Sequence, residues 1–147
     1  MIGDRLDSDI AGAHAVGIAS LWVATGVHDA HDLARAPKDQ RPTYIAADLG
    51  ALAQKQPGVK VDGGKHTCAG WTAEVVSGSV AIKGEGEPYD GLRAILSAVW
   101  AAVDEPPKPA KTAAKAAGRG RRPLPKPGPA LGSIAIDTAL HRVGLDK

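Results

Sequence analysis

With 147 residues, 44% of them hydrophobic, the chain is long enough for one ordinary domain or for a small domain with appendages. Its single cysteine, Cys68, excludes an internal disulfide framework, and the absence of a secretory signal or of an apolar run of roughly 20 residues predicts a cytoplasmic protein. The formal net charge of +2 hides an asymmetry, because a strongly basic segment near the C-terminus is joined to an acidic remainder, so a globally basic, nucleic-acid-binding fold is not implied.

The first third of the chain has the pattern of a parallel α/β sheet. Ser8 is a candidate N-cap for a short helix, which Gly17 can end in left-handed geometry. The nearly continuous apolar run 18–25 predicts a strand that is covered on both faces. A helix, a strand and a helical stub are then expected at residues 28–36, 44–46 and 48–52. This alternation predicts part of a sheet flanked by helices.

A second pattern begins after a turn-rich boundary at residues 56–64. Two strand-length segments, 71–76 and 79–83, are joined across Ser77-Gly78 and predict a hairpin. The pattern between Pro88, which suits a first helical turn, and Pro106, which ends a helix, predicts an amphipathic helix. Its apolar residues recur at helical spacing: Leu92, Ile95, Leu96, Val99 and Val103. The chain therefore indicates a small α+β extension at residues 63–105.

The segment 106–130 is rich in Pro, Ala, Lys and Arg, and we expect a disordered linker there. Its basic side chains are Lys108, Lys111, Lys115, Arg119, Arg121, Arg122 and Lys126, and it has no acidic residue. Such a segment can also bind nucleic acid or another acidic partner through salt-sensitive, sequence-independent contacts. We favour the linker interpretation, and we expect a final short helix within residues 131–147.

The chemistry of the N-terminal segment lies in Gly3-Asp4 and in Asp9. Gly3 allows a sharp turn at a strand end, and Asp4 would then lie at the carboxyl end of that strand, where open α/β sheets bind ligands. Mg²⁺ prefers one or two carboxylates with waters and phosphate oxygens, and Asp9 is placed to hydrogen-bond ligated waters or to orient neighbouring groups. From spacing alone, acids that simply cap the helix are the favoured interpretation.

The segment "GDRLDSDIAGA", with the later "TGV" and "RPTYIAADLGAL", resembles haloacid dehalogenase superfamily phosphatases of the NagD-like branch. The fourth motif of that branch reads G-D-R-L-x-T-D-I-x-G-A, and here Ser8 stands in place of its Thr. The resemblance covers residues 1 to about 52 and implies that residues 1–55 are the C-terminal part of a Rossmann-like parallel sheet. It also implies that Asp4 ligates Mg²⁺, that Asp9 is the supporting acid, and that a small phosphorylated metabolite is the substrate.

The segment from Cys68 to Ala102 is similar to an extra C-terminal module of actinobacterial members of this family, some of which are glycerol 3-phosphate phosphatases. That module has been likened to part of an acetyltransferase fold. No acyl-coenzyme A loop is recognisable here, so we assign no acetyl transfer.

Essential parts of the family's machinery are not found in these 147 residues. The family forms an aspartyl phosphate on an Asp of a D-x-D motif that follows the first strand. The one D-x-D here, Asp7-Ser8-Asp9, lies inside the fourth motif and follows no hydrophobic strand. We therefore expect a C-terminal fragment whose other motifs and cap lie upstream of Met1, with a bare sheet side, low solubility and no activity alone. The runner-up is a non-catalytic module whose basic segment binds an acidic partner.

Three other groups were weighed as sites. His28, Asp29, His31 and Asp32 could bind a transition metal, although a solvated first helical turn is the favoured interpretation. The pair His66 and Cys68 could face one side of a strand, but two ligands do not make a zinc site. We expect Trp71 and Trp100 to pack between the hairpin and the helix rather than to stack on a ligand.

Overall fold

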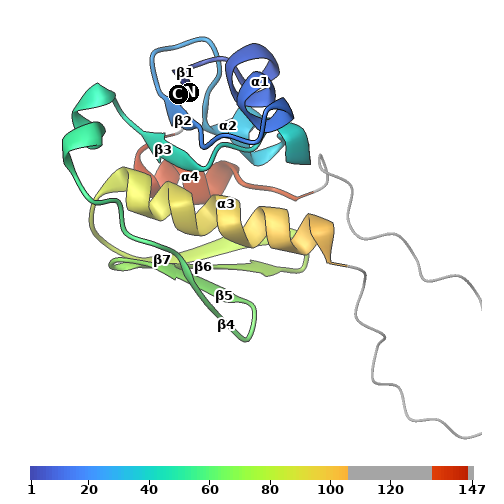
Figure 1. The fold of residues 1–147 in the computed structure, drawn as a ribbon. Coiled ribbons are helices and arrows are strands. Elements are labelled where there is room, and N and C mark those ends of the chain that lie inside the picture. The colour runs from blue at the N-terminus through green and yellow to red at the C-terminus, as the bar shows by residue number, and fades with distance from the viewer. Residues whose placement is uncertain (106–133, 146–147) are drawn as a thin grey trace, which may run out of the picture.

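The computed structural model describes residues 1–105 and 134–145. Two sheets lie on opposite sides of the long helix α3 (Pro88–Asp104), as Figure 1 shows. The predicted α/β fold class is confirmed: a parallel sheet with helices is followed by a separate antiparallel sheet and its helices. The predicted linker at 106–130 lies outside the described residues.

The first sheet is parallel and has the strand order β1-β2-β3. Its strands are short: β1 (Ile2–Gly3), β2 (Leu21–Val23) and β3 (Tyr44–Ala46). The helical segments around it are η1 (Leu6–Ile10), α1 (Ala11–Ala15), α2 (Ala30–Ala34), η2 (Lys38–Gln40) and η3 (Leu49–Ala53). Parallel pairing brings the carboxyl ends of all three strands to one edge of the sheet.

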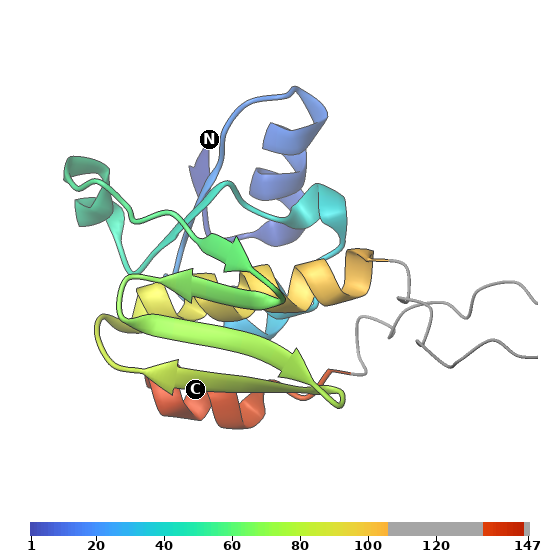
Figure 2. The same ribbon diagram turned by 90° about the horizontal axis from the view of Figure 1, so that it is seen from below.

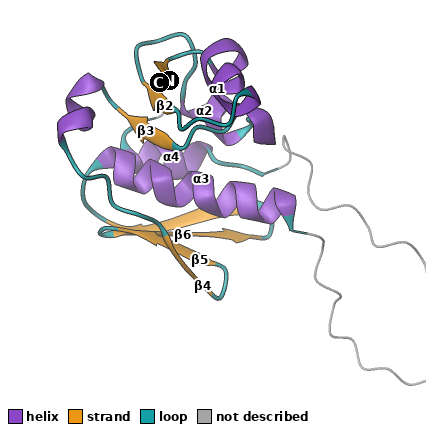
Figure 3. Cartoon of the chain, viewed as in Figure 1, coloured by secondary structure: helices purple, strands orange, loops and turns teal. Residues whose placement is uncertain are grey.

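The second sheet is an antiparallel meander, β4-β5-β6-β7. Its strands are β4 (Lys60–Asp62), β5 (Lys65–Cys68), β6 (Trp71–Val76) and β7 (Ser79–Gly84). Figure 2 shows these strands in front of α3, with α4 (Asp137–Val143) beside them, and Figure 3 distinguishes the strands from the helices. The predicted hairpin at Ser77-Gly78 is confirmed, because both residues have the positive φ angles, 51° and 79°, of a tight two-residue turn.

Helix α3 is shared by the two sheets. Trp22 and Ile45 from the parallel sheet belong to the same buried cluster as Trp71 from the antiparallel sheet and Ile95 from α3. The bare side expected for the parallel sheet is therefore not this one. The helix of the extension covers it, because α3 has apolar residues on more than one face.

The opposite side of the parallel sheet has much less cover. Leu21, Val23 and Ala46 form a small separate cluster against the partly buried Ala51. In the register of the strands, Ile2 and Tyr44 lie on the same face, and both are substantially exposed. Strand β1 is also an edge strand of this sheet.

Several local expectations were wrong. Ser8 is not an N-cap, because it lies inside η1, a π-helical turn that begins at Leu6 and has no side-chain cap. The strand expected at 18–25 is limited to Leu21–Val23, since β1 and β3 offer partners only over that length. The turn-rich segment 56–64 also contains β4, and β5 follows it directly; neither strand was predicted, and the two meet at a hairpin turn through Gly63 and Gly64 (φ 55° and 89°).

Trp71 packs as expected between the hairpin and α3, and its indole Nε1 donates to the Glu87 carbonyl at 3.0 Å. Trp100 does not belong to that contact: its Nε1 donates to Leu33 O at 3.1 Å, and its ring lies under the Arg41 guanidinium. Among the described residues, no helix has the length and apolar character needed to cross a bilayer.

Candidate metal centre

Asp4 follows β1 directly and is held by two residues from the end of β2 and the loop beyond it. The Thr25 hydroxyl donates to Asp4 Oδ2 at 2.8 Å, and the Trp22 indole Nε1 donates to the Asp4 carbonyl at 3.2 Å. Asp4 therefore lies at the carboxyl edge of the parallel sheet, the edge at which open α/β sheets bind ligands.

Asp9 folds back from η1 over the end of β1. Its Oδ2 accepts a hydrogen bond from the Arg5 backbone N–H at 3.2 Å. A Cβ atom at Gly3 would overlap the Asp9 carboxylate, so only glycine allows this close approach. Asp9 therefore braces the loop that carries Asp4.

The remaining acid of the D-x-D sequence, Asp7, is exposed and forms an ion pair with Arg5, with Nη2 to Oδ2 at 2.9 Å. The hydrogen bond from Arg5 lowers the pKa of Asp7. This pairing occupies the carboxylate with a neighbouring guanidinium.

The donor set at the loop fits a hard divalent cation that takes most of its ligands from elsewhere. Asp4 supplies a carboxylate, which Mg²⁺ prefers, and one or two protein carboxylates are usual for this ion. Among residues 1–105 and 134–145, no group of three or more His, Cys, Asp or Glu side chains is arranged to hold a metal ion. The described part of the chain thus offers one carboxylate of the kind that Mg²⁺ prefers and no closed cage of protein ligands.

The side chains of the His28–Asp32 cluster have separate partners. His28 Nδ1 accepts from the Leu6 backbone N–H at 3.2 Å. Asp29 caps α2 by accepting from the His31 and Asp32 backbone N–H groups, and Asp32 completes a capping box. His31 approaches Asp137 of α4 at 3.7 Å. The structure thus does not bring these residues together as metal ligands.

His66 and Cys68 lie on the same face of β5, and both are buried. His66 Nδ1 is 2.8 Å from the Ser97 hydroxyl of α3, and Cys68 Sγ approaches the Pro57 carbonyl. Burial lowers the pKa of His66 and raises that of Cys68. These residues belong to the packing between β5 and α3.

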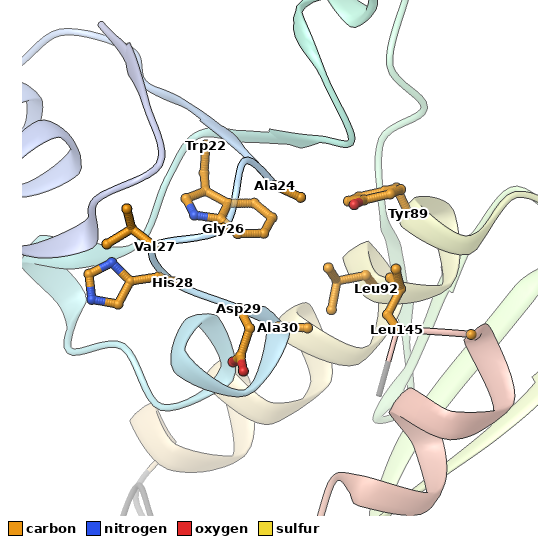
Figure 4. A pocket seen from close by; sticks show the side chains of 11 residues that line it. Trp22, Ala24, Gly26, Val27, His28, Asp29, Ala30, Tyr89, Leu92 and Leu145 are labelled. Carbon is orange, nitrogen blue, oxygen red and sulfur yellow. The ribbon is translucent and has the colours of Figure 1, made fainter. Parts of the chain in front are cut away.

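A pocket of about 530 Å³ lies where the end of β2 and the loop after it meet α3 and the end of α4. Figure 4 shows Trp22 and Ala24 on one side and Tyr89, Leu92 and Leu145 on the other. Asp4 does not line this pocket. Burial is the main cause that raises the pKa of Tyr89, so its phenol stays protonated at neutral pH.

The sequence pattern predicts no role for Thr25 or Trp22. Thr25 belongs to the "TGV" segment, which is significant in the sequence only as part of the family pattern. Trp22 lies within an apolar run, and no sequence pattern indicates that its indole donates to a carbonyl 18 positions away.

Comparison with known proteins supports the resemblance. Residues 1–52 match the HAD-hydrolase-like family model, and residues 68–123 match the model of a GCN5-related N-acetyltransferase-like domain. Residues 1–52 are thus similar to haloacid dehalogenase-like hydrolases. The domain boundaries expected at 1–55, 63–105, 106–130 and 131–147 stay predictions.

The chain is similar to D-glycerol 3-phosphate phosphatase of Mycobacterium tuberculosis, with 41% identity over 111 residues. The match covers 69% of this chain and 30% of the relative. A crystal structure of glycerol phosphate phosphatase from the same organism, in complex with magnesium, matches with a TM-score of 0.59 at 42% identity, over 69% of this chain and 30% of that one. Its calcium complex matches with a TM-score of 0.55 at 38% identity, over 74% and 32%. The chain thus spans about a third of the length of these relatives.

Proposed function

We propose that this chain contributes the metal-binding loop of a Mg²⁺-dependent phosphatase that acts on small phosphate esters such as glycerol phosphates. The proposal rests on the position of Asp4. This residue lies at the carboxyl edge of the parallel sheet, and Thr25 holds it there by a hydrogen bond. The 41% identity to a glycerol 3-phosphate phosphatase, together with a solved magnesium complex, supports the choice of substrate and ion. We place the protein in the cytoplasm.

Each residue of the loop has a distinct task in this proposal. Asp4 is the ligand of the cation, and Asp9 is the supporting acid that braces the loop through Arg5 N. A bound Mg²⁺ would neutralise charge on the phosphate and so make attack at phosphorus easier. The loop residues hold the Asp4 carboxylate in position to bind the cation that would neutralise the phosphate charge.

The nucleophile is proposed to come from outside these 147 residues. An Asp would attack phosphorus, the ester oxygen would leave with a proton, and water would then hydrolyse the aspartyl phosphate. Asp7 is a poor candidate for that role because Arg5 pairs with it at the surface. We expect the isolated chain to hydrolyse no glycerol 3-phosphate.

A chimaera tests this proposal. The chain would replace the matching segment of the Mycobacterium tuberculosis phosphatase, and Mg²⁺-dependent release of phosphate from glycerol 3-phosphate would be measured. We expect an active chimaera, and Asp4→Asn should lower kcat/KM by roughly 100-fold or more because a charge-stabilising ligand is lost.

The matched control is Asp62→Asn, which changes an exposed acid on the antiparallel sheet and should leave activity unchanged. A folded chimaera without activity, or an Asp4→Asn chimaera with full activity, would contradict the proposal. Hydrolysis by the isolated 147-residue chain would contradict the part that concerns the nucleophile.

The alternative of a non-catalytic module with a nucleic-acid-binding basic segment depends on residues 106–127. They lie outside the described residues, so this alternative stays a prediction.

A further inference from the structure

The carboxylate of Asp4 is held by a side chain from another strand end, and this contact lies next to the proposed cation position. Thr25 Oγ1 donates to Asp4 Oδ2 at 2.8 Å, across 21 positions of sequence. A carboxylate that ligates a cation is ionised and can only accept hydrogen bonds, so the hydroxyl has to be the donor. The bond occupies one oxygen and limits rotation of the carboxylate about its side-chain bonds.

The position of Thr25 is itself fixed by the sheet. Its backbone N–H donates to Val23 O at 2.9 Å, which closes a tight turn directly after β2. The Ala24 N–H donates to Ala46 O at 3.1 Å and ties the same segment to β3. Gly26 follows with φ of 115°, a conformation that lets the chain leave the sheet at once. The hydroxyl is therefore presented by a rigid strand end.

The backbone of Asp4 is held from the same strand. Trp22, which is almost fully buried, donates from Nε1 to the Asp4 carbonyl at 3.2 Å. Trp22 thus holds the main chain of Asp4 and Thr25 holds its side chain. Two contacts from β2 and its end together define the direction of the carboxylate relative to the sheet edge.

We infer that Thr25 is a positioning residue for the Asp4 carboxylate, which it aims at a hard divalent cation. The inference deepens the proposed function and depends on it. Groups that hydrogen-bond a metal ligand and orient it usually affect metal affinity by roughly 10- to 100-fold. Thr25 is exposed, so loss of its hydroxyl should change the ligand far more than the stability of the fold.

The test uses the chimaera with the Mycobacterium tuberculosis phosphatase, because the proposed site takes its other ligands from outside this chain, and Mn²⁺ as a paramagnetic probe for the Mg²⁺ position. Wild type here means the chimaera without further substitution. Broadening of backbone amide signals would locate the ion, and a titration would give its Kd. We expect the Asp4 and Arg5 amides to broaden most. Thr25→Val should weaken binding by about 10-fold or more, and Thr25→Ser, which keeps the hydroxyl, should restore most of it.

A second readout needs no metal. Three-bond couplings report the χ1 rotamer of Asp4, which should be single in the wild type and in Thr25→Ser but averaged in Thr25→Val. The control is Thr72→Val, because Thr72 pairs with Thr67 on the antiparallel sheet and does not contact Asp4. This control should change neither Kd nor rotamer.

The possible outcomes distinguish failure of the positioning role of Thr25 from failure of the proposed function. If the wild type binds Mn²⁺ beside Asp4 and Thr25→Val binds it equally well with the same rotamer, the positioning role is refuted and the proposed function stands. If the wild type binds no Mn²⁺ beside Asp4, the proposed function fails and the inference falls with it. Equal losses in Thr25→Val and Thr25→Ser would also refute a role for the hydroxyl.

Discussion

The two sheets differ in how far neighbouring segments of the sequence supply their strand pairing and their hydrophobic cover. The antiparallel sheet joins strands that are neighbours in the sequence, and two-residue turns set its register. The parallel sheet has strands of only two or three residues, an edge strand at β1, and one face with little cover. Its other face is covered by α3, which follows the antiparallel sheet in the sequence. The comparison shows that the segment with the proposed chemistry depends on the extension for much of its core.

The largest effect is expected from the centre of the shared helix. Ile95→Ala removes a fully buried side chain from α3 and should lower the free energy of unfolding by about 2–5 kcal/mol. Urea denaturation would be followed by tryptophan fluorescence and far-UV circular dichroism. The two probes should report one transition if the sheets share a core.

Leu52→Ala is the matched control, because Leu52 is 63% exposed and its truncation should change stability by less than about 0.5 kcal/mol. Two separated transitions in the wild type would show that the sheets unfold independently, which would refute the dependence drawn from the comparison.

A smaller effect is expected at the polar contact between the two parts. Arg41 donates to the Ala36 carbonyl at 3.0 Å and to Asp104 of α3 at 2.7 Å, and its guanidinium lies 5.2 Å from the centre of the Trp100 ring. Arg41→Gln should cost about 1–3 kcal/mol of stability, since Asp104 loses a charged partner. Asp104 is partly exposed, so solvent screening keeps the effect below that of Ile95→Ala.

A double-mutant cycle with Asp104→Asn measures the coupling between these two side chains. We expect a favourable coupling that weakens in high salt. Additive effects of the two substitutions would contradict a direct contribution of this ion pair to holding the parts together.

The smallest effect is a pH dependence confined to the extension. Burial lowers the pKa of His66, so protons bind more readily to the unfolded chain than to the folded one. The contribution of His66 is therefore fully present above the unfolded pKa of about 6.5 and is lost as the pH falls from there through the lower folded pKa.

Urea midpoints at pH 7.5 and at several values below 6.5 would measure this loss, and His66→Gln should reduce it. His14→Gln changes an exposed histidine on α1 and should keep the wild-type pH dependence. The same slope in His66→Gln as in the wild type would contradict the assignment.

Predictions from sequence succeeded where the pattern was local. The strand at 44–46, the hairpin at Ser77-Gly78 and the long helix from Pro88 agree with the structure. Periodicity and turn chemistry act over a few residues, so they can be read without knowledge of the fold. The hairpin of β4 and β5 also had a local signal, Asp62-Gly63-Gly64, which the sequence analysis took for a boundary only.

Predictions failed where a distant partner decides the outcome. Trp100 has an apolar body and one N–H donor, and nothing in its own segment says that Leu33 O accepts from it. The limits of β2 are set by β1 and β3, and the covered face of the parallel sheet is provided by α3. Strand limits and packing partners depend on which surfaces meet in the folded chain. An apolar run in the sequence is compatible with several such partners.

By itself, the sequence determined the order of the elements apart from β4, β5 and η2, the acidic loop after the first strand and its likeness to the fourth motif of haloacid dehalogenase phosphatases. It named Asp4 and Asp9, because the motif places these acids at fixed spacing. Only the tertiary structure decided what holds Asp4: Thr25 and Trp22 reach it from the end of the neighbouring strand, about 20 positions further along the chain. The physical reason is that parallel pairing aligns strand ends that are far apart in sequence, so contacts at a sheet edge arise only when the sheet forms.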